Sequence, residues 1–460
     1  MYKKKAHIHF MGIGGIGMSG IAKVLKGQGY TISGCDLDQQ QKTIDQLKEM
    51  GCTITNQHDS LLCKDESIDI LVYSSAIPQN HPEIIHAKKR CIPVIPRALM
   101  LAELMRTKFS IAIAGSHGKT TTTSMISHIL IHAQLNPTVI IGGHLKNIST
   151  NAQLGNGDFL VAEADESDRS LLKLHATLGL ITNIDLEHLD TYKDLDDIKS
   201  TFKQFLNNLP FYGKAILCID DQNTCSLLPL PHLKIITYGF NEDADICGKA
   251  ISLERSISSC TVYEKNKKLG ILRIKMAGEH NLQNALGAIA VARDLDVPFP
   301  IIAEALESLE GIDRRFSSHG TFKGAEIFDD YAHHPNEITQ ILKVARKRTK
   351  KKLHVLFQPH RYSRTLHLWN DFLDAFLTSN IDHLILTDIF PASEAPINGV
   401  SSENLVAAIK KGNPTFSISY IPLDDKFEAL ISYLNTSTEK DDLVLLLGAG
   451  KIYQIPDILK

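Results

Sequence analysis

The chain has 460 residues, which is too long for one ordinary core, and at roughly 100 to 200 residues a domain we expect about three domains. With 43% hydrophobic residues, 22% charged residues and a net charge of −3, its composition gives no reason to expect nucleic acid as a partner. The absence of any apolar run near the roughly 20 residues of a membrane span argues against membrane insertion. The eight cysteines contain no C-x-x-C pair, which argues against a disulfide framework or a zinc ribbon. We therefore expect a soluble cytoplasmic protein.

Short apolar runs alternate with helical patterns along most of the chain, which is typical of α/β units around parallel sheets. The first predicted domain, 1–106, contains the runs "IHFMG", "TISGCD" and "DILVYSSAI". The second, 107–312, opens with "FSIAIAGSHGKTTTTSM", and the third, 313–460, ends with "DLVLLLGAGKI". The one basic cluster, "ARKRTKKK" at 345–352, follows a helical pattern, and we interpret it as the solvated end of a helix.

A glycine motif follows the first predicted strand. In "HIHFMGIGGIGMSGIAKVL", residues 7–25, Gly12, Gly14 and Gly17 form G-x-G-x-x-G before a helical pattern, as in dinucleotide-binding folds. Asp36 follows the next strand, about where a ribose-binding carboxylate is expected. The motif alone leaves an NAD(P)-dependent dehydrogenase open.

The strongest chemical signal is the phosphate loop in "IAIAGSHGKTTTTSM", residues 111–125. Backbone N–H groups of such a loop bind phosphate oxygens; Lys119 would reach the β- and γ-phosphates, and the Thr120 hydroxyl would bind Mg²⁺. The pattern is the short form G-x-x-G-K-T, with Ile113 where the general motif has glycine. Strand, loop, Lys-Thr and helix nevertheless follow in order, which favours a nucleotide site over a chance glycine turn.

Acidic residues end two later apolar runs, "FLVAEADESD" (159–168) and "LGLITNIDLEHLD" (178–190). Because carboxylates at the carboxyl ends of parallel strands lie beside the ligand crevice, these runs favour one or two Mg²⁺ ions. In the third domain, "DDYAHHP" (329–335) and "FQPHRYSRT" (357–365) also follow apolar runs. Arg361 and Arg364 are candidates to bind a carboxylate or a transferring phosphoryl group.

Eight segments of the chain, taken in order, resemble the signature segments of the Mur ligases. They are "MGIGGIGMSGIA", "GSHGKTTTTSM", "EADESD", "TNIDLEHLDTY", "GEHNLQNALGAIAVA", "GIDRRF", "DDYAHHPNEI" and "FQPHRYSRT". The resemblance covers nearly the whole chain, and the short phosphate loop is the form this family has. It implies a three-domain α/β architecture: a Rossmann-like N-terminal domain that binds a UDP-sugar, a central P-loop ATPase domain and a Rossmann-like C-terminal domain that closes on the amino acid.

Within the family, the resemblance is strongest to the members that use ATP to join L-alanine to the lactyl carboxylate of UDP-N-acetylmuramate. It implies an acyl phosphate intermediate, release of ADP and phosphate, and a place in peptidoglycan precursor synthesis. Phosphorylation has a chemical reason, because a free carboxylate has no good leaving group. Two anions must then meet, and Mg²⁺ and fixed cations offset their repulsion.

The resemblance also implies residue roles. The implied UDP-sugar residues are Gly12, Gly14, Gly15, Gly17, Ser74 and Ser75. The implied ATP residues are Gly115, Ser116, His117, Gly118, Lys119, Thr120, Thr121, Asn281, Asn284, Arg315 and Asp330. The implied Mg²⁺ ligands are Thr120, Glu163 and His188, and the implied amino-acid residues are His333, His360, Arg361 and Arg364. Lys119, His188, Arg361 and Arg364 are the expected catalytic residues. Asp36 is then either part of the sugar site or an ordinary acid at a strand end.

Four alternatives remain at this point. A recycling ligase that adds a preformed peptide to UDP-N-acetylmuramate is the nearest, although "GIGGIGM" counts against it. A folylpolyglutamate synthetase would not need the N-terminal nucleotide fold. A dehydrogenase leaves 115–120 unexplained, and a non-catalytic UDP-sugar sensor has no use for Lys119.

Two matters stay open, and one movement is expected. The sequence leaves open the oligomeric state and the choice among L-alanine, glycine and L-serine, because a methyl or hydroxyl changes binding by only about 1 to 3 kcal/mol. Because the reacting groups come from separate domains, we expect substrate binding to close the domains together.

Overall fold

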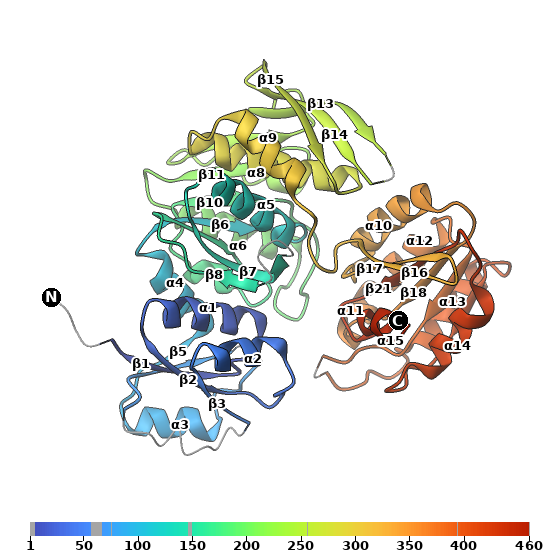
Figure 1. Cartoon of the computed structure of the whole chain (residues 1–460), viewed down its shortest axis with the longest axis horizontal. Helices are drawn as coiled ribbons and strands as arrows, with labels where there is room; N and C mark the ends of the chain where they lie inside the picture. Colours follow the sequence, from blue (N-terminus) through green and yellow to red (C-terminus); the bar gives the residue numbers. More distant parts are fainter. Residues whose placement is uncertain are drawn as a thin grey trace.

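The computed structural model describes residues 5–56, 67–74, 76–145, 150–254, 256–392 and 394–459. The chain forms three α/β domains, each around its own sheet, and Figure 1 shows the C-terminal domain beside the other two. Among the described residues, no helix is both long and apolar enough to span a membrane.

The N-terminal domain has a five-stranded parallel sheet in the order β3-β2-β1-β4-β5, the first five positions of a Rossmann sheet. Successive residues of β1 face opposite sides, so Phe10 packs beneath α1 and Met11 beneath α3. The strands are β1 His7–Met11, β2 Thr31–Cys35, β3 Thr53–Thr55, β4 Ile70–Tyr73 and β5 Val94–Pro96. The helices are α1 Ile16–Gly27, α2 Lys42–Glu49, α3 Pro82–Lys89 and α4 Arg97–Met105.

The central domain has a ten-stranded sheet in the order β15-β14-β13-β12-β11-β10-β6-β9-β7-β8. Its strands are β6 Phe109–Ala114, β7 Thr138–Leu145, β8 Thr150–Gln153, β9 Phe159–Glu163, β10 Leu178–Ile181, β11 Lys214–Cys218, β12 Lys234–Gly239, β13 Ile246–Leu253, β14 Ser258–Glu264 and β15 Lys267–Ile274. Its helices are α5 Lys119–His132, α6 Leu195–Asn207, α7 Gln222–Cys225, α8 Glu279–Asp294, α9 Phe299–Ser308 and the 3₁₀ turn η2 Ser170–Lys173. Strands β10, β6 and β9 are parallel neighbours, so the residues that follow them meet at one sheet edge.

Both ends of this sheet differ from the parallel arrangement that the sequence predicted. At one edge β8 pairs antiparallel with β7, and at the other β13, β14 and β15 pair antiparallel. Lys265 and Asn266 connect β14 to β15 with φ of 46° and 65°, the conformation of a two-residue type I′ hairpin. The local turn therefore sets an antiparallel extension beyond the α/β core.

The C-terminal domain has a six-stranded sheet in the order β16-β17-β21-β18-β19-β20, parallel except for β16. The strands are β16 Ser317–Phe322, β17 Ala325–Asp330, β18 Leu353–Phe357, β19 His383–Leu386, β20 Ile418–Tyr420 and β21 Leu443–Leu447. The helices are α10 Pro335–Arg348, α11 Tyr362–His367, α12 Trp369–Leu377, α13 Ser402–Gly412, α14 Glu428–Ser437, the 3₁₀ turn η3 Ile452–Gln454 and α15 Ile455–Ile458. The basic cluster lies at the end of α10, where Arg346 pairs with Asp382 and Arg348 with Glu326.

The N-terminal domain packs against the central sheet through α1. A Cβ at Gly20 would lie 3.3 Å from the Cβ of Ala152 on β8, so a small residue permits this close approach. Lys23 of α1 donates hydrogen bonds to Asn151 on β8, at 2.7 Å, and to Gln46 on α2. Burial lowers the pKa of Lys23 to about 8. These contacts fix the helix that follows the first glycine motif onto the central domain.

Candidate functional site

The phosphate loop lies between β6 and α5, as predicted. Gly118 precedes α5 with φ of 82°, and a Cβ there would lie 2.5 Å from Oδ1 of Asn284, so both conformation and space require glycine. Residues after β10 hold the loop. The N–H of His117 donates to Oδ1 of Asn183 at 2.9 Å, and the hydroxyl of Thr182 donates to the carbonyl of His117 at 2.6 Å. These bonds hold the loop in one conformation at the N-terminus of α5, where backbone N–H groups can bind phosphate oxygens.

Lys119 folds back over this loop. Its Nζ donates to Oε1 of Glu166 at 2.8 Å and to the carbonyls of Gly115 and Ser116. Burial alone would lower the pKa of Lys119, but the charges of Glu166 and Glu187 outweigh burial and raise it. A permanent positive charge thus lies within the loop.

A group of metal-type ligands adjoins Lys119. Ligand atoms of Glu166, Glu187 and His188 lie within 4.8 Å of one another. Nε2 of His188 is 3.4 Å from Oε1 of Glu166 and 3.6 Å from Oε2 of Glu187. Oε2 of Glu166 is buried and has no hydrogen-bond partner among the described residues. Two carboxylates, one with an unpaired buried oxygen, and an imidazole fit a divalent cation.

The three predicted metal ligands do not form one group in the structure. Thr120 lies beside Glu163, and Oε1 of Glu163 accepts a hydrogen bond from the N–H of Gly142 at 2.9 Å. Burial raises the pKa of Glu163 in spite of these contacts and the nearby Lys119. His188 lies instead with Glu166 and Glu187. Glu163 and the group that contains His188 both lie close to Lys119, so the three predicted metal ligands are divided between two groups beside this lysine.

The C-terminal domain reaches the phosphate loop through the start of α10. Nε2 of His117 lies 3.0 Å from Oδ2 of Asp185, and its Nδ1 lies 3.3 Å from Oε1 of Glu337. Asn336 donates a hydrogen bond to the same Asp185 carboxylate. Burial would lower the pKa of His117, but Glu187, Asp185 and Glu337 raise it well above its ordinary value. His117 is therefore a cation held between acids of two domains.

A cavity of about 680 Å³ lies between the phosphate loop, α8 and the start of the C-terminal domain. Its lining includes these predicted ATP residues: His117, Gly118, Thr121, Asn281, Asn284, Arg315 and Asp330. The Asp330 carboxylate accepts from the N–H groups of Phe316 and Ala332, at 2.8 and 2.7 Å, and burial raises its pKa to about 6. Asp330 thus shapes the cavity wall, and the cavity volume suits a nucleotide.

The predicted amino-acid residues gather in the C-terminal domain. Nη1 of Arg364 lies 3.1 Å from Nδ1 of His360, and the rings of His333 and His360 are 5.7 Å apart. Burial and Arg364 lower the pKa of His333 to about 4; burial, His333 and Arg364 lower that of His360 to about 3. Both imidazoles are therefore neutral near pH 7.

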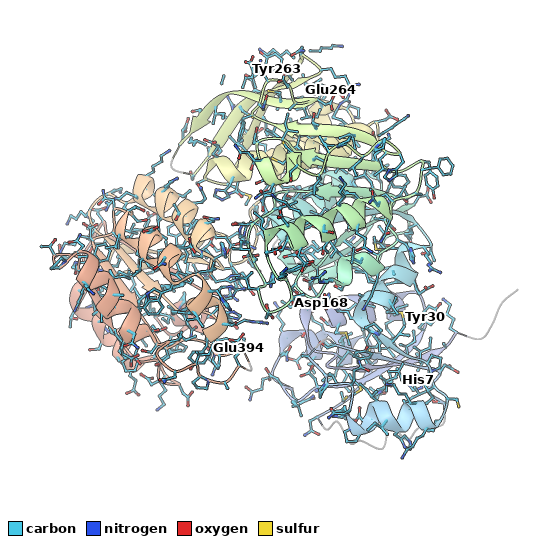
Figure 2. All side chains as sticks on the ribbon, turned by 180° about the vertical axis from the view of Figure 1, so that it is seen from behind. His7, Tyr30, Asp168, Tyr263, Glu264 and Glu394 are labelled. Atoms are coloured by element: carbon cyan, nitrogen blue, oxygen red, sulfur yellow. The ribbon has the colours of Figure 1, made fainter. Side chains whose placement is uncertain are left out.

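Arg361 joins this group to the central domain. Its Nη1 lies 3.2 Å from Oδ2 of Asp190 and 3.6 Å from Oε1 of Glu394. Figure 2 shows Glu394 on the side of the C-terminal domain that faces the others. A cavity of about 30 Å³ there is lined by Arg361, Arg364 and His188 among others, so the two arginines adjoin the metal-type group.

The two neighbouring histidines of "HHP" face different partners. His333 lies beside His360, as above. His334 is 3% exposed, and its ring nitrogens lie 3.8 Å from Asp185 and 3.9 Å from Glu187. The sequence drew attention to both histidines but assigned a site role to His333 alone, whereas the structure also places His334 against the acids beside the phosphate loop.

The glycine loop of the N-terminal domain is fixed by Asp36. The N–H of Gly14 donates to Oδ2 of Asp36 at 2.8 Å, so this acid supports the loop. A Cβ at Gly12 would lie 3.2 Å from the Cβ of Ser74, so Ser74 borders the loop as predicted. Gly15 precedes α1 directly. Ser75 lies outside the described residues.

The sequence reasoning missed Arg97. This residue begins α4, and its Nη1 lies 2.7 Å from where a Cβ of Gly17 would be. Its Nη2 pairs with Oδ2 of Asp165 at 3.0 Å. An arginine at the positive end of a helix is electrostatically unfavourable, and this was the available signal that it has an anionic partner. Arg97 thus links the glycine loop to the acids after β9.

Three family models match the chain. Residues 7–109 match the Mur ligase family catalytic domain, 113–292 the Mur ligase middle domain and 314–450 the Mur ligase glutamate ligase domain. Over 456 residues the chain is 48% identical to UDP-N-acetylmuramate–L-alanine ligase of Geobacter sulfurreducens, covering 99% of this chain and 97% of that protein. The ligase of the same name from Geotalea daltonii is 47% identical over 454 residues, with the same coverage.

Solved structures are similar over the whole chain. The UDP-N-acetylmuramate–alanine ligase MurC of Thermotoga maritima has a TM-score of 0.80 and 26% identity, covering 98% of each chain. A murein peptide ligase from Psychrobacter arcticus has a TM-score of 0.74 and 24% identity, covering 99% of this chain and 98% of that one, and shares the fold.

Proposed function

Because the chain belongs to the Mur ligase family, we propose that it uses ATP to join L-alanine to the lactyl carboxylate of UDP-N-acetylmuramate. The products are the amide, ADP and phosphate. We propose the cytoplasm as its compartment and peptidoglycan precursor synthesis as its pathway.

One observation carries the proposal: the acids that flank the phosphate loop contact both other domains. Asp165, after β9, pairs with Arg97 beside the glycine loop. Asp190, after β10, pairs with Arg361 of the C-terminal domain. Figure 2 shows Asp168, close in sequence to Asp165, where the central domain approaches the N-terminal one. A sugar diphosphate at the glycine loop and an amino acid at the arginines would thus meet beside the ATP phosphates.

The reaction begins with the lactyl carboxylate. Its oxygen attacks the γ-phosphorus of ATP, the bond to the β-phosphate oxygen breaks, and ADP leaves. Lys119 lies in the loop that would hold these phosphates, and its charge stabilises the negative charge that spreads over the transferring group.

We propose Mg²⁺ as the cofactor. One or two ions would be held by Glu166, Glu187 and His188, together with Thr120 and Glu163. Bound Mg²⁺ would neutralise charge between the carboxylate and the γ-phosphate. Lys119 shares Glu166 with this group, so the protein places one fixed cation beside the ion site.

The second step is attack by the amine of L-alanine on the acyl carbon. The tetrahedral intermediate then collapses: the nitrogen gives up a proton, the bond to the phosphate oxygen breaks, and phosphate leaves with that proton. Arg361 and Arg364 would bind the amino-acid carboxylate, and the neutral rings of His333 and His360 line the same region without adding charge.

Phosphate release from Mg-ATP tests this proposal. With UDP-N-acetylmuramate present, L-alanine, glycine, L-serine and a muramyl-type tripeptide are compared as acceptors. We expect release to depend on both the sugar and L-alanine, with a product mass that fits the amide. Release with the tripeptide alone would assign the recycling reaction, and tight UDP-sugar binding without release would favour a sensor.

A further inference from the structure

A cluster of polar side chains lies inside the N-terminal domain, on the sheet face that α3 covers. His9 of β1 and Cys35 of β2 are 0% exposed, and Glu83 of α3 is 3% exposed. Ligand atoms of the three lie within 4.8 Å of one another. Their neighbours on this face are the apolar Met11 and Leu71 and the polar His7 and Ser33. None of the three takes part in the proposed reaction.

The donor set is that of a transition-metal site. An imidazole nitrogen, a thiolate sulfur and a carboxylate oxygen are the ligands that Zn²⁺ takes in proteins. Sγ of Cys35 lies 3.5 Å from Oε2 of Glu83. Two such atoms bound tetrahedrally to one zinc ion would be about 3.6 Å apart, given bond lengths of about 2.3 Å and 2.1 Å. The thiolate and carboxylate would also neutralise the double charge of the ion, which burial requires.

The surroundings of the cluster support a ligand role for His9. Oγ of Ser33 lies 2.8 Å from Nδ1 of His9 and 2.8 Å from Nε2 of His7, so it bridges the two rings. A second hydrogen-bonded group of this kind fixes the ring and its tautomer in metal sites, with Nε2 as the ligand atom. Ser33 precedes Cys35 by two residues on β2, so both side chains face α3.

We propose that His9, Cys35 and Glu83 form a binding site for a zinc-type divalent cation, separate from the magnesium site. A bound cation would restrict the movement of the glycine loop through the end of β2. The carbonyl of Cys35 accepts hydrogen bonds from the N–H groups of Gly12, at 2.8 Å, and Ile13, at 3.2 Å. A cation bound to the Cys35 side chain therefore fixes the strand end that holds this loop.

Cobalt titration of the metal-free full chain tests the proposal. Two other clusters, His117–Asp185–His334 and Glu166–Glu187–His188, contain no cysteine. A thiolate-to-cobalt charge-transfer band therefore distinguishes the proposed site from both, because Co²⁺ bound to nitrogen and oxygen ligands alone gives no such band. We expect this band to saturate at about one Co²⁺ per chain and to disappear when Zn²⁺ is added. No band at saturating Co²⁺ would overturn the proposal.

Variants locate the site. Cys35→Ser should abolish the band, and His9→Gln should weaken Co²⁺ binding about tenfold or more. Cys218→Ser, at a buried cysteine of β11, should leave the band unchanged. A band that survives Cys35→Ser, or that is lost in Cys218→Ser, would contradict the assignment. Circular dichroism of the metal-free variants checks folding, and Glu83→Gln, also expected to weaken binding, replaces Cys35→Ser if that variant does not fold.

Discussion

At the scale of single residues, Lys119 has two competing partners. Its side chain is 17% exposed, and its ammonium is bound to Glu166 and to carbonyls of its own loop. A γ-phosphate would compete with Glu166 for the same charge, and a released Glu166 carboxylate could then face a cation. The Lys119–Glu166 pair thus couples the phosphate loop to the metal-type group.

Replacing Lys119 tests this role. Lys119→Ala should lower phosphate release by about 10²- to 10³-fold or more, because one fixed donor to the transferring group is lost. Calorimetric binding of the UDP-sugar, which depends on another domain, should hardly change. Lys249→Ala, at a lysine paired with the exposed Glu242, is the matched control. Near-normal turnover of Lys119→Ala would refute the assignment of the phosphate loop.

Arg97 offers a second test at this scale. Arg97→Ala should raise KM for the UDP-sugar about tenfold or more, because a charged hydrogen bond contributes about 1.5 to 3 kcal/mol. KM for ATP should change little. Lys26→Ala is the control, since this lysine near the end of α1 bonds to the carbonyl of Gly51 within the same domain, away from the glycine loop. An equal rise in both KM values would instead indicate a general loss of domain packing.

Residue types and spacing predicted many of these positions, but not their pairing. The G-x-x-G-K-T motif predicted the loop, the lysine and the helix start, because each follows from local backbone chemistry. The pairs Arg97–Asp165 and His117–Glu337 join residues 68 and 220 positions apart. Only the packing of domains brings such residues together, so spacing alone could not reveal them.

At the scale of elements, the turns that precede α10 and α11 place two neutral histidines next to Arg364. His333 lies in the first turn and His360 in the second. In the folded chain their pKa values are about 4 and about 3, whereas the ordinary value is 6.5. Below pH 6.5 the unfolded chain therefore takes up protons that the folded chain does not, which favours unfolding.

This difference predicts that acid weakens the C-terminal domain. Between pH 7 and pH 5 the free energy of unfolding should fall by at most about 2 kcal/mol for each of the two histidines. The single tryptophan of the chain, Trp369, begins α12, so its fluorescence reports urea unfolding of this domain. His333→Gln should show a smaller loss, and the exposed His232→Gln should behave as the parent. An unchanged pH dependence in His333→Gln would contradict the prediction.

Sequence patterns predicted the α/β units well, because apolar runs and helical periods are local properties. The hairpin of β14 and β15 was not predicted. One face of these strands is partly exposed, so buried and exposed residues should alternate along them. The exposed Ile271 and the buried Ser258 blur this alternation in the sequence.

At the scale of the whole molecule, the C-terminal domain already touches the central one. His117 meets Glu337, Asn336 bonds to Asp185, and Arg361 pairs with Asp190. The expected closure on substrates therefore has defined contacts, all beside the phosphate loop. The order of the domains along the chain was predictable from the sequence. The contacts between the central and C-terminal domains were not, because they join side chains from distant segments.

Solution scattering tests the closure. We expect the radius of gyration to decrease when an ATP analogue and the UDP-sugar bind together. Asp185→Ala removes the partner of both His117 and Asn336, so its decrease should be smaller. Asp243→Ala, at an exposed acid of the central domain, should compact like the parent chain. Identical scattering curves with and without ligands would rule out the movement.

The shared walls of the 680 Å³ cavity bear on how the protein avoids wasting ATP. An acyl phosphate reacts with water as well as with an amine, so an always-formed site would consume nucleotide without making product. Here the loop that we propose holds the ATP phosphates comes from one domain, and Arg315 and Glu337 come from another. A complete site exists only while the two domains are together, which confines the reactive intermediate to the interval in which its acceptor is also enclosed.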